Sequence, residues 1–210
     1  MLLWINGPFG GGKTQTAAEL HRRLPGSVIC DPEDVGFGLH RMMPAALRSD
    51  FQDLRAWRQG VYEVLDLAVS KHDGTVIVPM TVIEPGYFSE TVGRLRDRGR
   101  NVRHFSLLAD RDTVLRRLRQ RSVVHSALFL GGKDTPVFRE SFAVSKLDLC
   151  LERLAGQEFA TQLRTDRMTV PQVAEQIAAS AGLVLLPNND STLRGSLRRT
   201  WTSLKHIRFD

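Results

Sequence analysis

The segment at residues 2–20 constrains the fold of this chain more than any other. Four apolar residues come first, a glycine-rich loop follows, and residues 15–20 have a helical composition. The loop consists of Gly7, Pro8, Phe9, Gly10, Gly11, Gly12, Lys13 and Thr14. A strand, a loop with the spacing Gly-x4-Gly-Lys-Thr and a helix, in this order, are typical of a phosphate-binding loop, or P-loop. The segment therefore predicts an α/β fold that binds a nucleoside triphosphate.

The residue types in this loop explain the prediction. Glycines have no Cβ, so successive main-chain N–H groups can turn toward phosphate oxygens, and the following helix adds the positive end of its dipole. We therefore expect residues 7–12 and Gln15 to bind ATP. Lys13 should reach the β- and γ-phosphates, and the Thr14 hydroxyl should bind Mg²⁺. A merely flexible glycine-rich turn is the alternative, but the flanking strand and helix disfavour it.

Length and composition bound the rest of the chain. A length of 210 residues, with 42% hydrophobic and 25% charged residues, suits one α/β domain with a small lid or tail. The longest apolar stretches are short and broken by Pro79 or Pro187, and the N-terminus lacks the basic region of a signal peptide. Cys30 and Cys150 form no CxxC pair and lie among apolar neighbours. We therefore expect a cytoplasmic protein with buried, reduced cysteines.

The balance of charge indicates an anionic partner. The formal net charge is +6 at pH 7, and nucleotide phosphates alone could supply the opposite charge. Nucleic acid is the other candidate. The arginines are dispersed, however, and neither aromatic–basic alternation nor zinc-finger spacing occurs. We expect no nucleic-acid binding.

Apolar runs alternate with amphipathic segments along the chain. The expected strands are residues 2–5, 27–30, 75–82, 101–108 and 159–164, and the expected helices are residues 13–24, 52–71, 87–98, 110–121, 141–154 and 170–181. This alternation predicts a layered α/β fold around a parallel five-stranded sheet. Residues 1–186 would form this domain, with a loop-like lid at residues 122–140. Residues 187–210 would form a linker and a basic amphipathic tail helix, which could dock on the protein or on an anionic membrane surface.

Asp31 is the strongest candidate for acid–base or metal chemistry. It follows the second predicted strand, and carboxylates at the carboxyl ends of parallel strands lie beside the P-loop in open α/β sheets. Asp31 could accept the proton of an attacking hydroxyl or hold Mg²⁺, although Asp-Pro is also a good turn start. No aspartate follows the strand at 75–82, where P-loop proteins usually carry one, and Thr81 is the only polar side chain there. We therefore assign the base or metal role to Asp31 and a substrate contact to Thr81.

Two groups of arginines are candidates for anion contacts. Arg41, Arg48 and Arg58 lie between the second and third strands, where small-molecule kinases hold the phosphate acceptor. A solvated surface role is the alternative for each of them. Arg117 and Arg121 share one face of a basic helix just before the lid, where they could stabilise a transferring phosphoryl group. A basic outer helix face is the alternative for this pair.

Several further segments resemble one family. They are residues 4–17, 19–24, 31–33, 77–81, 93–96, 118–121, 194–199 and 206–208. These segments are similar to the tunicamycin-resistance ATP-binding proteins of bacteria, the TmrB type. The P-loop is shared by many proteins, but the Val-Pro-Met-Thr segment at 78–81 and the Arg-Gly-Ser-Leu-Arg-Arg segment at 194–199 are more particular. The chain is longer than the family pattern around residues 128–136.

The resemblance implies a three-layer P-loop NTPase fold like that of nucleoside-monophosphate kinases, ATP binding, and resistance to the nucleoside antibiotic tunicamycin. It also implies a peripheral position on the inner face of the cell membrane through the tail. Analogy with small-molecule kinases favours transfer of a phosphoryl group to a tunicamycin hydroxyl. The alternative is that the protein binds tunicamycin in an ATP-dependent manner and sequesters it at the membrane without a reaction. A kinase for a housekeeping metabolite is a third, weaker possibility.

Overall fold

The computed structural model describes residues 1–128, 144–156 and 161–189, and for residues 121–128 it describes the main chain alone. The strands are β1 (Leu2–Asn6), β2 (Val28–Ile29), β3 (Val76–Pro79), β4 (Val102–Leu108) and β5 (Thr161–Arg164). They form one five-stranded sheet in the order β2-β3-β1-β4-β5, and every neighbouring pair is parallel. The predicted parallel five-stranded sheet is thus confirmed.

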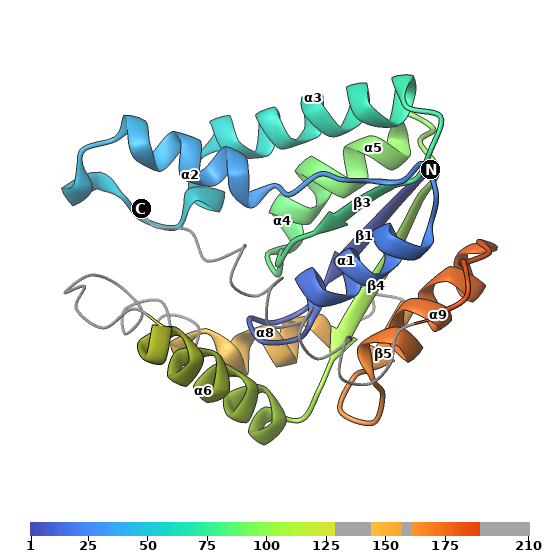
Figure 1. Ribbon diagram of the computed structural model, residues 1–210. Helices are drawn as coiled ribbons and strands as arrows, with labels where there is room; N and C mark the ends of the chain where they lie inside the picture. Colours follow the sequence, from blue (N-terminus) through green and yellow to red (C-terminus); the bar gives the residue numbers. More distant parts are fainter. Residues whose placement is uncertain (129–143, 157–160, 190–210) are drawn as a thin grey trace.

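Helices cover the sheet on both faces (Figure 1). They are α1 (Lys13–Arg23), α2 (Glu33–Met42), α3 (Arg55–Lys71), α4 (Pro85–Phe88), α5 (Arg94–Asp97), α6 (Arg111–Leu128), α8 (Leu147–Leu154) and α9 (Val170–Ala181). A π-helical turn, Ser89–Gly93, joins α4 to α5, and 3₁₀ turns occur at Ala45–Leu47 and Phe51–Asp53. We call residues 31–74, which connect β2 to β3, the insertion.

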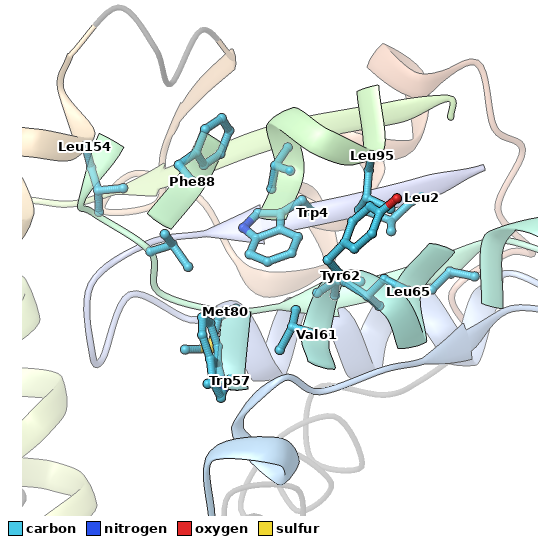
Figure 2. Packing of buried hydrophobic residues seen from close by; sticks show 14 of the residues in the cluster. Leu2, Trp4, Trp57, Val61, Tyr62, Leu65, Met80, Phe88, Leu95 and Leu154 are labelled. Carbon is cyan, nitrogen blue, oxygen red and sulfur yellow. The ribbon is translucent and has the colours of Figure 1, made fainter. Parts of the chain in front are cut away.

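The core is divided between the two faces because successive strand residues point to opposite sides of the sheet. Leu2 and Trp4 of β1 pack with Trp57 of α3 and with residues of α4 and α5 (Figure 2). Leu3 and Ile5, the alternate residues, pack on the other face with α1 and α9. The sheet and its two helical layers confirm the predicted three-layer fold.

Several predicted boundaries need correction. The loop-like lid predicted at 122–140 is wrong for residues 122–128, which continue α6; the first glycine after this helix is at residue 131. Residues 80–82 do not extend β3, and α3 begins at Arg55 because residues 51–53 form a 3₁₀ turn. The rest of the lid and the tail helix lie outside the described residues. Helix α9, by contrast, has the predicted bounds, with Thr169 in a capping box and Gly182 (φ +70°) after its end.

The two cysteines differ in exposure. Cys150 is buried in α8, as predicted, whereas Cys30 is only half-buried at the end of β2. Burial raises the pKa of both thiols above the usual value. No helix in the described part of the chain combines the length and the apolar character needed to cross a membrane.

Candidate functional site

The predicted P-loop connects β1 directly to α1. Gly10 and Gly12 have φ angles of +75° and +97°, which L-residues with a side chain rarely adopt. A Cβ at Gly10 would also come within 3.1 Å of Leu118 Cγ on α6. The Gly11 N–H donates to the Pro8 carbonyl at 2.9 Å and closes the turn. The sequence requires glycine here both for the backbone conformation and for the close approach of α6.

Lys13, the first residue of α1, reaches back across this loop. Its Nζ donates to the carbonyl oxygens of Gly7 at 3.0 Å and Pro8 at 3.1 Å. The side chain is buried and lies 5.5 Å from the centroid of the Phe9 ring. The ammonium group is therefore held within the loop, beside the N-terminus of α1, where an incoming phosphate would meet both positive charges.

The side chains of Asn6 and Thr81 hold the start of the loop through hydrogen bonds. Asn6 Oδ1 accepts from the N–H groups of Gly7 at 2.9 Å and Val82 at 3.1 Å, and Asn6 Nδ2 donates to the Val82 carbonyl at 2.7 Å. The Thr81 hydroxyl donates to the Gly7 carbonyl at 2.8 Å. Both side chains are buried. Thr81, predicted to contact the substrate, uses its hydroxyl to fix the loop, and sequence analysis missed Asn6 altogether.

Asp31 lies between β2 and the start of α2, at the same sheet edge as the P-loop, because β1 and β2 run in the same direction. It is half-buried, and its Oδ1 accepts from the Glu33 N–H at 3.0 Å. Its main-chain oxygen accepts from the Asp34 N–H at 3.1 Å. A role of Asp31 in starting the turn is therefore compatible with a role as a base or metal ligand, because the turn orients the carboxylate at the sheet edge.

An aromatic cluster supports the segment around Asp31. Trp57 Nε1 donates to the Pro32 carbonyl at 2.9 Å, and the Trp57 ring lies 5.6 Å from the Phe51 ring. The Phe51 ring also packs edge-on to Phe37 of α2 at 5.9 Å. A Cβ at Gly36 would come within 2.5 Å of the Phe51 ring, so α2 and the Phe51–Asp53 turn touch at this point. This packing fixes the base of the insertion.

The three insertion arginines predicted to contact an anion have different surroundings. Arg48 is exposed, and its Nε donates to the Met43 carbonyl at 3.2 Å. Arg41 is exposed near the end of α2. The Arg58 guanidinium binds Glu90 Oε2 at 2.8 Å and the Gln52 carbonyl at 2.5 Å, and it lies 4.5 Å from the centroid of the Tyr87 ring. Arg58 thus braces α3 against the α4–α5 segment, and an acceptor would have to share it with these groups.

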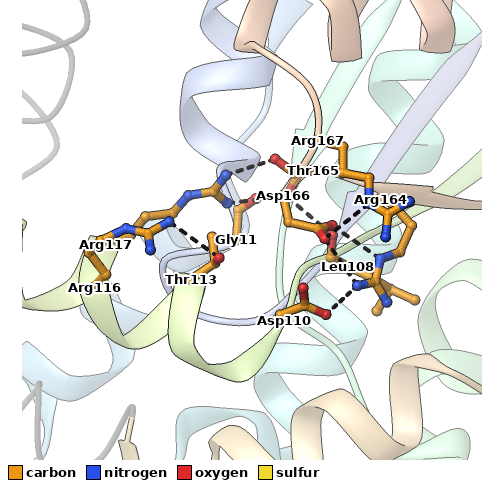
Figure 3. A network of polar contacts seen from close by, with 10 residues as sticks. All are labelled: Gly11, Leu108, Asp110, Thr113, Arg116, Arg117, Arg164, Thr165, Asp166 and Arg167. Carbon is orange, nitrogen blue, oxygen red and sulfur yellow. Dashed lines mark hydrogen bonds and ion pairs between the residues drawn. The ribbon is translucent and has the colours of Figure 1, made fainter.

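Arg117 joins α6 to the end of β5 beside the P-loop (Figure 3). It donates to Thr165 Oγ1 at 3.1 Å and to the Thr165 carbonyl at 2.8 Å, while the Thr165 N–H donates to the Leu108 carbonyl at 2.7 Å. Thr165 Oγ1 is also 3.5 Å from the Gly11 carbonyl. Burial lowers the pKa of the Arg117 guanidinium, and Arg116 adds to the effect. Sequence analysis missed Thr165, which links Arg117 to the loop.

Arg121 lies one helical turn beyond Arg117 on α6, and its side chain is outside the described part of the structure. The carboxylates after β4 and β5 are occupied elsewhere: Arg164 binds both Asp110 and Asp166 (Figure 3). Its hydrogen bonds lower the pKa of Asp166 to about 2. Both carboxylates are thus engaged in an ion-pair network with Arg164, and Asp31 stays the predicted acid.

The described residues contain no group of three or more His, Cys, Asp or Glu side chains that could hold a metal ion. Magnesium in phosphoryl-transfer sites is usually bound by one or two protein oxygens together with the phosphates and water. The predicted pair, Thr14 on α1 and Asp31 after β2, is such a sparse set, and both residues lie at the carboxyl edge of the sheet. These donors fit Mg²⁺ bound with a nucleotide, not a metal site made by the protein alone.

Comparisons with known proteins agree with this geometry. A family described as an AAA domain matches residues 2–129. The structure of a tunicamycin resistance protein from Deinococcus radiodurans is 34% identical in sequence, with a TM-score of 0.70, and the alignment covers 89% of this chain and 99% of that one. Among curated proteins, none matches.

More distant solved structures share the fold. A shikimate kinase from Bacteroides thetaiotaomicron is 16% identical with a TM-score of 0.56, over 87% of this chain and 99% of the other. The Mycobacterium tuberculosis APS kinase CysC, in complex with AMPPNP and APS, is 14% identical with a TM-score of 0.53, over 85% and 95% of the two chains. At these identities the likeness shows a common P-loop kinase-like fold alone.

Proposed function

We propose, because this chain belongs to the tunicamycin-resistance protein family and carries its AAA-type P-loop domain, that it transfers a phosphoryl group from ATP to a hydroxyl of tunicamycin. The observation that carries the proposal is the placement of Asp31. A carboxylate held by the start of α2 lies at the same sheet edge as a P-loop that contains a buried lysine. A protein that only stored the antibiotic would not need a base there.

The residues of the loop would bind and orient the triphosphate. Main-chain N–H groups of residues 7–14 would bind the phosphate oxygens, and Gln15 would lie at the start of α1 beside them. The Lys13 ammonium would move from the Gly7 carbonyl to the β- and γ-phosphates. Mg²⁺, bound by the Thr14 hydroxyl with Asp31 nearby, would supply further positive charge to the phosphates.

The insertion would hold the acceptor. Asp31 would accept the proton of the attacking hydroxyl, and Arg41 and Arg58 would contact the acceptor. Arg117 and Arg121 would neutralise charge on the phosphoryl group as it leaves ADP for the acceptor oxygen. In this transfer the new O–P bond to the acceptor would form as the O–P bond to ADP breaks, and the hydroxyl proton would go to the Asp31 carboxylate.

Mass spectrometry tests the reaction directly. Purified protein incubated with ATP, Mg²⁺ and tunicamycin should yield a product heavier by about 80 mass units, the mass of one phosphoryl group, together with ADP. If neither the heavier product nor ADP forms, the phosphotransferase proposal is wrong. A parallel incubation with sugars and other nucleosides would reveal a housekeeping kinase, because such a substrate would then be phosphorylated instead.

The second candidate is ATP-dependent binding of tunicamycin without a reaction. The observation that favours it is the absence of a carboxylate from residues 80–83, directly after β3. The substitution Asp31→Asn distinguishes the two functions. A kinase should lose about 10²- to 10⁴-fold in rate, as expected for the loss of a general base. Sequestration needs no base, so cells with the variant would stay resistant.

We also propose a cytoplasmic protein that associates with the inner face of the cell membrane through its basic tail, residues 187–210. The support is the helical spacing of apolar residues opposite basic ones at residues 193–208, which lie outside the described residues. Removal of residues 192–210 should release the protein from anionic lipid vesicles in a sedimentation assay. Equal sedimentation of the two proteins would show that the tail is not the membrane contact.

A further inference from the structure

The insertion and the P-loop are connected through one residue, Thr81. Its hydroxyl donates to the Gly7 carbonyl at 2.8 Å, and its own carbonyl accepts from Gln52 Nε2 at 3.1 Å. Thr81 is buried, so its bond to Gly7 does not compete with bulk water, while its bond to Gln52 is partly buried. The loop that would bind triphosphate and the segment that would bind the acceptor therefore share a continuous hydrogen-bonded path.

Gln52 is itself firmly placed within the insertion. Its N–H donates to Asp50 Oδ1 at 3.1 Å, which caps the Phe51–Asp53 turn, and its carbonyl accepts from Arg58 Nη1 at 2.5 Å. At the other end of the turn, the Tyr87 hydroxyl donates to Asp53 Oδ1 at 2.8 Å. The turn is therefore held at both ends, and the Gln52 amide is the side chain that bonds it to Thr81.

Nucleotide binding would affect this hydrogen-bonded path first at the Gly7 carbonyl. It accepts from both the Thr81 hydroxyl and the Lys13 ammonium, at 2.8 and 3.0 Å. A phosphate that draws the ammonium away leaves this carbonyl to the Thr81 hydroxyl, so the bond to Thr81 strengthens. Occupation of the loop would therefore change the hydrogen bonding of Thr81, the residue to which the Gln52 amide is bonded.

We propose that Gln52 is a positioning residue that orders the acceptor-binding insertion when nucleotide occupies the P-loop. It acts through Thr81 and touches neither the phosphates nor the reacting hydroxyl. The proposal deepens the proposed function, since it gives the insertion a nucleotide-dependent order, but it requires only that the loop bind a nucleotide. A purely structural Gln52 would stabilise the fold equally with and without nucleotide.

Hydrogen exchange of the full chain tests the proposal. In the wild-type protein, AMPPNP with Mg²⁺ should slow amide exchange in residues 51–58 by about fivefold, the size expected for one hydrogen bond. The variant Gln52→Met keeps the length of the side chain but cannot donate a hydrogen bond. It should bind AMPPNP with an affinity within about twofold of the wild type and lose the slowing. Gln52→Lys, which restores a donor, should recover part of it.

Gln59→Met is the matched control within the same insertion. The Gln59 amide donates to Glu63 and accepts from Arg94, and none of these contacts leads to the P-loop. This variant should show the wild-type slowing at residues 51–58. The proposal is overturned if Gln52→Met retains the slowing, or if the wild type binds AMPPNP and shows none. Failure to phosphorylate tunicamycin would leave these outcomes unaffected, whereas failure to bind AMPPNP would overturn both proposals.

Discussion

The P-loop and the insertion lie at the same edge of the sheet but are built in different ways. The loop is defined by its main chain: glycine conformations, carbonyl oxygens around Lys13 and the buried amide of Asn6. The outer part of the insertion is defined by exposed side chains. Met42 is 83% exposed and Leu47 is 64% exposed, and residues 44–49 are all exposed. The P-loop is fixed by buried contacts, and the outer part of the insertion has few internal contacts that restrict its sequence.

This contrast suits a protein that combines a common donor with a particular acceptor. A triphosphate presents the same oxygens whatever the acceptor is, so a main-chain cradle can be used unchanged. An acceptor has to be recognised by side chains, which loops on a rigid scaffold provide. The two halves should therefore respond differently to substitution, and four experiments test this from the largest expected effect to the smallest.

Trp57→Ala should have the largest effect on stability. The side chain is fully buried in the core between α3 and the sheet, and its loss should lower the free energy of unfolding by about 3–5 kcal/mol. Urea unfolding measures this change. Trp57→Phe keeps a ring but removes the hydrogen bond to Pro32, and should cost about 1–3 kcal/mol. We expect the AMPPNP affinity of the folded Trp57→Phe protein to stay near the wild-type value; a large loss would show that the shape of the loop depends on the packing of Trp57.

Lys13→Met should abolish most activity without a comparable loss of stability. Removal of one preorganised group that stabilises transition-state charge typically costs 10²- to 10³-fold in kcat, or about 3 kcal/mol. Turnover of ATP in the presence of tunicamycin measures the loss. Lys71→Met, at the exposed end of α3, is the control and should keep full activity. Normal turnover by Lys13→Met would contradict the assigned role of the loop.

Acidification should weaken the sheet face that carries the insertion. His104 of β4 packs against the Phe88 ring at 4.8 Å, and burial lowers its pKa to about 3, with Arg96 adding to the effect. The folded protein keeps this ring neutral, while the unfolded chain takes up a proton below about pH 6.5. Stability is therefore full above pH 6.5 and declines as the pH falls toward 3. The expected loss between pH 7.5 and 5 is about 2 kcal/mol.

Urea unfolding at the two pH values measures this loss, and two histidine variants identify its source. His104→Leu should remove most of the difference between pH 7.5 and 5. His21→Leu, at an exposed position of α1 on the opposite face, should leave it unchanged. A pH dependence that survives in His104→Leu would assign the effect to other groups.

Arg41→Ala should have the smallest effect, confined to the acceptor. The side chain is exposed, so a contact with a bound acceptor should contribute about 1 kcal/mol, or roughly fivefold in kcat/KM for tunicamycin. The affinity for AMPPNP should not change. Arg103→Ala, an exposed arginine at the start of β4 and thus far from the carboxyl edge of the sheet, serves as the control. An equal loss in both variants would remove Arg41 from the acceptor site.

The sequence predicts what local rules determine. The spacing of glycines before Lys13 indicates the P-loop, and a threonine, a proline and a terminal glycine indicate the bounds of α9. The contacts that hold the site are different in kind. Asn6 bonds to a residue 76 positions away, Thr165 to one 57 away and Gln52 to one 29 away. Periodicity carries no signal for such bonds, because they depend on which strand ends the sheet brings together.

The predicted lid and the surroundings of Asp31 show a further limit of what the sequence can predict. The glycines at 131–132 and Pro136 favour a loop in the predicted lid, but a helix can continue through residues that do not break it, and α6 reaches Leu128 before the first glycine. Asp31 can be predicted because acids at the carboxyl ends of parallel strands are a general feature of this fold class. The support behind it, from Trp57 and Phe51, comes from the packing of α3 on the sheet and has no local sequence signal.

The close approach of Gly36 to the Phe51 ring limits how the acceptor range of this protein can evolve. Any side chain at position 36 would push the ring, and with it the turn that carries Gln52. A library selected for resistance to altered antibiotics should therefore retain glycine at 36 in every survivor. The substitutions that survive should be concentrated at residues 41–49, whose exposed positions can be replaced without disturbing the contact between Gly36 and Phe51.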